Sequence, residues 1–180
     1  VLPETSKQLR AIMEDLIKRG KIGNDSKIAF VNDGSKDTTW NIISQLHDEN
    51  PLFTGINLAH NRGHQNALFA GLMTAKDYAD AAISLDADLQ DDVDAIEQFI
   101  DKYLEGKDIV YGVRSTRETD TAFKRGTAHA FYKLMNAMGA DTLEDHADYR
   151  LMSKRALEAL SEYDEVNLFL RGIVPMIGFE

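Results

Sequence analysis

The chain has 180 residues, which is enough for one domain with a substantial hydrophobic core. Hydrophobic residues make up 43% and charged residues 28%, as in soluble globular domains. The formal net charge of −10 argues against general nucleic-acid binding, and the lack of cysteine excludes disulfides and thiolate metal sites. No apolar run has the length of a membrane span, so any membrane contact of this stretch is expected to be peripheral.

Apolar residues recur at helix and strand spacings along the first part of the chain. The spacing over residues 9–17 predicts a helix, with Thr5 or Ser6 as its cap and Gly20 as its end. Strands are then predicted at 28–31, 53–58, 81–85 and 109–113, and helices between them around 40–46, 67–75 and 93–103. This alternation predicts an α/β fold with a largely parallel sheet covered by helices on both faces.

The pattern changes after Arg114. One long helix from about Phe123 to Met138, a polar loop and two further helical stretches are predicted there. The apolar side of the long helix is more typical of a core or a dimer surface than of a membrane face, so a homo-oligomer is one expectation. At the other end, Val1 to Glu4 indicate the lead-in to a helix, and we expect a strand to precede them in the natural protein.

An acidic motif follows the apolar run 81–85. Asp86, Asp88 and Gln90 share one side if the extended alternation continues, and they lie at the carboxyl end of a strand, where open α/β sheets bind ligands. Oxygen-only ligands suit Mg²⁺ or Mn²⁺, which usually hold substrate phosphates. The alternative is an acidic, solvated loop, because an isolated pair of aspartates at this spacing is common.

Two other strand ends carry polar turns. Asp33, in Asn32-Asp33-Gly34-Ser35, could accept hydrogen bonds from a base or a ribose, or could belong to an Asx-type turn that caps the next helix. The turn 61–63 could face a phosphate or could simply begin a helix.

Basic residues gather locally in this acidic chain. They could hold a diphosphate or an acceptor phosphate, or could be solvated helix charges paired with nearby acids. Arg171 lies on an otherwise apolar helix and needs an anionic partner, either a carboxylate or a substrate phosphate. The clustered residues are Arg114, Arg117, Lys124 and Arg125.

The order of these motifs resembles glycosyltransferase family 2, and most closely its polyprenyl-phosphate glycosyltransferase branch. The resemblance covers nearly the whole chain and implies a GT-A fold, in which an α/β domain binds a nucleotide sugar in inverting, metal-dependent enzymes. Members of the family open with a strand that this chain lacks at its start. The motifs are Asn-Asp-Gly-Ser at 32–35, Asn-Arg-Gly at 61–63, Leu-Asp-Ala-Asp-Leu-Gln-Asp at 85–91, Tyr-Gly-Val-Arg at 111–114 and Asp-Tyr-Arg-Leu-Met-Ser at 148–153.

The resemblance also implies roles for single residues. Asp33 would contact the nucleoside, and Asp86, Asp88 and Gln90 would hold the metal and the diphosphate. Asp148 would lie on the acceptor side and act as a base or orient the acceptor. The alternative is that Asp148 pairs with Arg150 or Arg114 and only shapes the loop.

The resemblance further divides the chain into a nucleotide-sugar-binding part, residues 1–115, and an acceptor-side part, residues 116–180. It places Asp148 in a loop before a helix that starts near Ser153.

The expected function is transfer of a hexose from a nucleotide diphosphate sugar, with a UDP-sugar as the commoner choice, to a polyprenyl phosphate at the cytoplasmic face of the membrane. One alternative keeps the fold and donor but uses a saccharide acceptor, and another is a nucleotide-sugar binder without activity. Haloacid-dehalogenase-type phosphatases also have two aspartates at this spacing, but early in the chain and with Thr or Val where Gln90 stands here.

Overall fold

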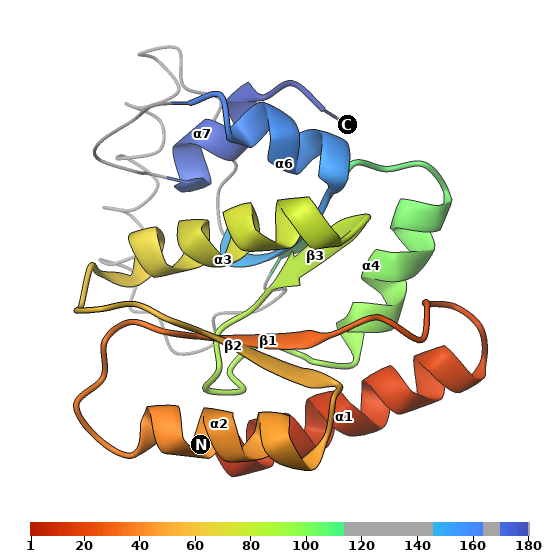
Figure 1. Cartoon of the computed structure of the whole chain (residues 1–180). Helices are drawn as coiled ribbons and strands as arrows, with labels where there is room; N and C mark the ends of the chain where they lie inside the picture. Colours follow the sequence, from red (N-terminus) through yellow and green to blue (C-terminus); the bar gives the residue numbers. More distant parts are fainter. Residues whose placement is uncertain (114–145, 164–169, 180) are drawn as a thin grey trace, which may run out of the picture.

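The computed structural model describes residues 1–113, 146–163 and 170–179 (Figure 1). Several predictions fall outside these residues, namely the long helix 123–138 and the basic residues Arg114, Arg117, Lys124 and Arg125. The side chain of Arg171 is also outside what the structure describes.

Helices and strands alternate along the chain, which confirms the predicted α/β fold class. The elements are α1 (Leu2–Lys18), β1 (Ile28–Asn32), α2 (Thr39–Glu49), β2 (Phe53–Asn57), α3 (His64–Tyr78), β3 (Ala81–Ser84), α4 (Ala95–Leu104), β4 (Ile109–Val113), β5 (His146–Ser153), α6 (Lys154–Leu160) and α7 (Leu170–Met176). The two helical stretches predicted near the end of the chain are α6 and α7.

The start of α1 differs from the prediction. The helix begins at Leu2, with Pro3 in its first turn, where proline is well tolerated because the first N–H groups have no helical partner. Thr5 and Ser6 therefore lie inside the helix and are buried, so the prediction that one of them caps it was wrong.

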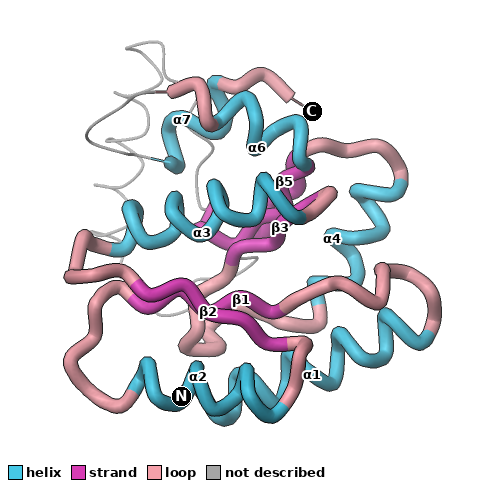
Figure 2. The backbone as a smooth tube through the Cα atoms, in the orientation of Figure 1, coloured by secondary structure: helices cyan, strands magenta, loops and turns pink. Residues whose placement is uncertain are grey.

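The strands form a parallel pair and an antiparallel set of three. β1 pairs with β2 in parallel, from Ile28 opposite Phe53 to Asn32 opposite Asn57. β5 lies between β3 and β4 and runs antiparallel to both. Figure 2 shows β5 beside β3. The sequence analysis missed β5, because charged residues inside it interrupt the apolar pattern of a buried strand.

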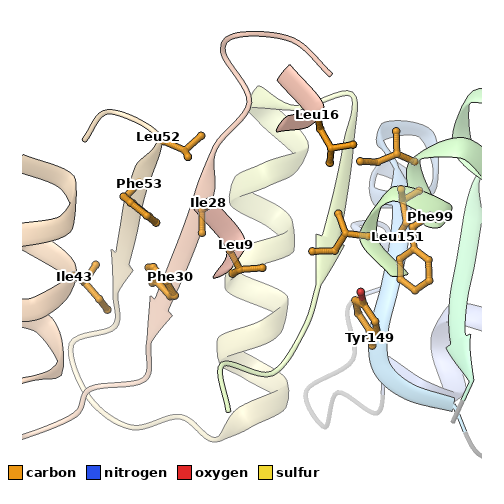
Figure 3. Close-up of a cluster of buried hydrophobic side chains, with 12 residues drawn as sticks. Leu9, Leu16, Ile28, Phe30, Ile43, Leu52, Phe53, Phe99, Tyr149 and Leu151 are labelled. Carbon is orange, nitrogen blue, oxygen red and sulfur yellow. The ribbon is translucent and has the colours of Figure 1, made fainter. Parts of the chain in front are cut away.

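The two sets of strands share one core although, among the described residues, no ladder joins β1 to β3. Figure 3 shows β1 and β3 in the same layer, with α3 crossing behind both, and α3 contacts both strands.

Helices cover both faces of the strands. One cluster of buried side chains joins α1, α2 and α4 to the sheet and includes Phe30, Phe99, Tyr149 and Leu151 (Figure 3). A second cluster joins α3, α6 and α7 to the opposite face and includes Met152 of β5. No helix in the described residues is both long and apolar enough to cross a membrane.

The alternation of side chains along β5 decides where its charges go. Tyr149 and Leu151 belong to the first cluster and Met152 to the second, as expected for successive residues of a strand. Asp148 and Arg150 therefore share the face of Met152 and point toward α3 and α7. Both are buried on that face.

Candidate functional site

The candidate site lies where the carboxyl ends of β1, β2 and β3 meet the beginning of β5. Ser84 ends β3 opposite Arg150, and its hydroxyl donates a hydrogen bond to the main-chain oxygen of Asp148 at 2.6 Å. Because β5 is antiparallel to β3, its first residues lie beside the acidic motif that follows β3. Asp148 is thus a strand residue, and its predicted place in a loop was wrong.

His64, the first residue of α3, connects Asp148 with the acidic motif. Its Nε2 lies 3.0 Å from Asp148 Oδ2 and 4.0 Å from Asp86 Oδ1. About half of the His64 side chain is exposed, whereas Asp148 is only 4% exposed. The structure therefore brings together Asp86 and Asp148, two predicted site residues that lie far apart in the sequence.

The acidic motif is a turn and does not continue the strand. β3 ends at Ser84, the chain turns at Ala87 and Asp88, and Leu89 has a φ of 60°. Asp88 Oδ1 accepts a hydrogen bond from the main-chain N–H of Gln90 at 3.0 Å. The alternation on which the shared side was predicted is therefore not present.

Two buried hydroxyls hold this turn from outside. Thr5 of α1, which is 1% exposed, donates a hydrogen bond to the main-chain oxygen of Ala87 at 2.7 Å. Tyr149 of β5 donates to the main-chain oxygen of Asp92 at 2.9 Å. Burial raises the pKa of Tyr149, so its hydroxyl remains a donor at physiological pH.

The electrostatics of the turn favour a cation. Partial burial raises the pKa of Asp86, and Asp91, Asp88 and Asp148 raise it further, while His64 opposes them. Clustered carboxylates that repel one another are stabilised by a cation placed between them. Within the described residues, no group of three or more acidic or histidine side chains is already arranged to hold a metal ion. The carboxylates and the amide of the turn nonetheless have the oxygen chemistry that Mg²⁺ and Mn²⁺ prefer.

Asp33 holds two loops together. Its Oδ1 accepts from the main-chain N–H of Arg62 at 2.6 Å, and its Oδ2 accepts from that of Gly63 at 2.9 Å. The loops approach closely at Gly34, where a Cβ atom would lie 2.5 Å from the main chain of His60. Asp33 is therefore fixed just after the carboxyl end of β1, and its contact with a nucleoside remains a prediction.

Asp148 is the centre of a buried polar network. Its Oδ1 accepts from Arg150 Nη2 at 2.6 Å, and its Oδ2 accepts from Gln65 Nε2 at 3.3 Å. Arg150 is completely buried. Both partners of the ion pair are removed from water, so neither charged group can bind to solvent instead of to the other. The position of Asp148 is therefore well defined.

The sequence analysis did not identify His64, Gln65, Arg150 or Thr5 as parts of the site. His64 and Gln65 follow directly on the polar turn 61–63, which it did single out, and that proximity was the available signal. Nothing in the sequence around Thr5 indicated its contact with the acidic turn, because this contact depends on the packing of α1 against a turn far along the chain.

The sequence matches the family described as "Glycosyl transferase family 2" over residues 4–161. It is 57% identical over its whole length to the uncharacterized glycosyltransferase YkoT of Bacillus subtilis, of which it covers 53%. Over 84% of its length it is 42% identical to the bactoprenol glucosyl transferase of Shigella phage SfV, of which 49% is covered. A prophage bactoprenol glucosyl transferase homolog of Escherichia coli matches to the same extent.

These matches confirm the predicted family. The chain belongs to glycosyl transferase family 2. It spans about half the length of the curated relatives that it matches.

The first prediction concerns the support of the acidic turn by Thr5. Thr5→Val keeps the shape of the side chain and removes the hydrogen bond to Ala87, so we expect the free energy of unfolding to fall by about 1 kcal/mol. The amides of residues 86–91 should also exchange faster with solvent. Thr74→Val is the matched control, because the exposed hydroxyl of Thr74 bonds only within α3. Denaturant unfolding and hydrogen exchange measure both effects, and equal exchange in the two variants would contradict the role of Thr5.

Proposed function

We propose that this chain forms the donor site and part of the acceptor site of an inverting, metal-dependent glycosyltransferase. The enzyme would move a hexose from a nucleotide diphosphate sugar, with a UDP-sugar as the expected donor, to a polyprenyl phosphate. The main support is the meeting of the acidic turn with Asp148 at one end of the sheet. Family membership and the relatives named bactoprenol glucosyl transferases support the same reaction.

The acidic turn is the proposed place of the metal and the diphosphate. Asp86, Asp88 and Gln90 would provide oxygen ligands to Mg²⁺ or Mn²⁺. When bound, such an ion neutralises the charge that develops on the departing nucleotide diphosphate. Burial raises the pKa of Asp86, and the nearby carboxylates of Asp91, Asp88 and Asp148 raise it further, which supports a cation at this turn.

Cationic side chains are proposed to hold the phosphates from the other side. Arg114 follows β4, and together with the other residues of the cluster it could neutralise a diphosphate or an acceptor phosphate. The members proposed for this role are Arg114, Arg117, Lys124, Arg125 and Arg171.

The environment of Asp148 supports a phosphate acceptor. Its carboxylate is buried, ion-paired with Arg150 and hydrogen-bonded to His64 and Gln65, so it is poorly placed to remove a proton from a hydroxyl group. A polyprenyl phosphate is already anionic and does not need a strong base. We therefore assign to Asp148 the orientation of groups at the acceptor side.

One observation favours the alternative of a saccharide acceptor. His64 is exposed and hydrogen-bonded to Asp148, an arrangement in which a carboxylate can orient an imidazole that takes a proton from a hydroxyl. The lipid acceptor and the saccharide acceptor predict different products, so one transfer assay can compare them directly.

The proposed place of action is the cytoplasmic face of the membrane, through peripheral contact by this part of the protein. A polyprenyl phosphate is anchored in the bilayer by its chain, whereas a nucleotide sugar is dissolved in the cytoplasm. The reaction must therefore occur where the two meet.

The second prediction is the outcome of this acceptor comparison. The complete protein is incubated with radiolabelled UDP-glucose, Mg²⁺ and either undecaprenyl phosphate or soluble oligosaccharides, and the label is followed into lipid or saccharide. We expect label in the lipid fraction only. Label in the saccharide would favour the alternative acceptor, and nucleotide-sugar binding without transfer to either would indicate a binder without activity.

The third prediction concerns the metal. Because an ion would bridge carboxylates and phosphates, UDP should bind at least about tenfold more tightly with Mn²⁺ than with a chelator. Asp88→Ala should abolish this difference, whereas Asp77→Ala, which removes an exposed carboxylate of α3, should preserve it. Calorimetry measures both affinities. Unchanged metal dependence in Asp88→Ala would refute the assignment of the turn.

The fourth prediction concerns Asp148. Asp148→Asn keeps the size of the side chain and removes its charge, so turnover should fall at least about tenfold while donor affinity stays the same. Arg150 loses its counter-ion in this variant, and we also expect a loss of stability of up to about 3 kcal/mol.

Initial rates and calorimetry are therefore measured at a temperature where circular dichroism shows the variant to be folded. Asp148→Glu, which keeps the charge, serves as the second variant and should retain more activity. Near-normal turnover in Asp148→Asn would refute the assignment of Asp148 to the acceptor side.

A further inference from the structure

Gln65 lies between the two halves of the candidate site. It is the second residue of α3, and it is half-buried. Its Nε2 donates to Asp148 Oδ2 at 3.3 Å, and its Oε1 accepts from the main-chain N–H of Leu170 at 3.2 Å. One amide group thus contacts both the central carboxylate and the first residue of α7.

The orientation of this amide follows from the chemistry of its partners. An ionised carboxylate such as Asp148 only accepts hydrogen bonds, and a main-chain N–H only donates them. The nitrogen of Gln65 must therefore face Asp148 and its oxygen must face Leu170. Gln65 thus provides the donor and the acceptor that these two partners need on one rigid amide group.

Leu170 is held from two directions. Its N–H donates to Gln65, while its main-chain oxygen accepts a hydrogen bond of 3.5 Å from Arg150 Nη1. Its side chain is completely buried in the cluster that joins α3, α6 and α7. The start of α7 is therefore tied to Asp148 through both Gln65 and Arg150.

On its other side, Gln65 is connected through the first turn of α3 to Asp33, which we expect to lie at the donor site. Gly63 caps the start of α3 and has a φ of 86°, and Asp33 fixes its main-chain N–H. Gln65 follows after one residue. A rigid path of short contacts therefore runs from Asp33 through the first turn of α3 to Gln65, Asp148 and Leu170.

We propose that Gln65 is a positioning residue that fixes Asp148 and the first turn of α7 together, and so aligns the acceptor side with the donor side. This inference rests on the proposed function, because it takes Asp148 to be at the acceptor side. Gln65 does not need to touch a substrate to act in this way. Its loss should disturb turnover with the acceptor and leave donor binding intact.

Two substitutions separate the two contacts of Gln65. Gln65→Glu keeps an oxygen that can accept from Leu170 but replaces the donor amide with a second carboxylate facing Asp148. Gln65→Leu removes both contacts at similar volume. Gln45→Glu is the matched control, because Gln45 is exposed on α2 and its Nε2 donates to the carboxylate of Glu49 at 2.7 Å.

The fifth prediction is tested on the complete protein with UDP-glucose and undecaprenyl phosphate. Both Gln65 variants should lower kcat about tenfold, with KM for UDP-glucose within about twofold of the unmodified protein. Gln45→Glu should be unchanged. In hydrogen exchange, the amide of Leu170 should lose protection in Gln65→Leu and keep it in Gln65→Glu.

The outcomes separate this inference from the proposed function. A normal kcat in Gln65→Glu would overturn the positioning role. A rise in the KM for UDP-glucose as large as the expected fall in kcat, in either variant, would also overturn it. Unchanged exchange at Leu170 in Gln65→Leu would overturn the link to α7, and this measurement needs no transfer activity. If Gln65→Leu does not fold, Gln65→Glu alone decides the kinetic part. If the unmodified protein transfers glucose to neither acceptor, the proposed function fails, whereas the exchange result still tests the contact.

Discussion

The ion pair between Asp148 and Arg150 is the interaction on which the rest of the site depends. The charged atoms are 2.6 Å apart, and Arg150 is completely buried. A buried charge without a partner costs several kcal/mol, so each residue requires the other as soon as β5 takes its place in the sheet. The pair leaves Asp148 Oδ2 to face α3, and His64 and Gln65 both contact that oxygen.

The same strand also serves the hydrophobic core. Tyr149 and Leu151 belong to the first apolar cluster, while Asp148 and Arg150 face α3 and α7 from the other side. Tyr149 additionally holds the acidic turn through Asp92. A change in the register of β5 by one residue would therefore bury the charges among apolar side chains and release the turn as well. Core packing and site geometry are determined together.

Local periodicity was sufficient to predict most of the fold. The strands before residue 114 and the helices between them follow from apolar spacing, and the motifs at their ends pointed to Asp33 and Asp86, whereas Asp148 was identified only through the family resemblance. The sequence could not predict β5, because Asp148 and Arg150 interrupt the apolar pattern of a buried strand and, besides their own ion pair, depend on partners far along the chain. For the same reason it could not predict that both carboxylate oxygens of Asp33 accept hydrogen bonds from the turn 61–63, or that Thr5 donates a hydrogen bond to the acidic turn. Such contacts depend on packing between segments far apart in the chain.

The position of β5 in the sheet has a consequence for folding during synthesis. β4 ends at Val113, but β3 and β4 are not neighbours, because β5, which begins at His146, lies between them. A growing chain can form α1 to α4 and the β1–β2 pair before this strand exists, since these depend on contacts near in sequence. The central sheet closes only after residues 146–153 have emerged. The candidate site is therefore assembled late, and an incomplete chain that stops earlier contains the acidic turn without the strand that organises it.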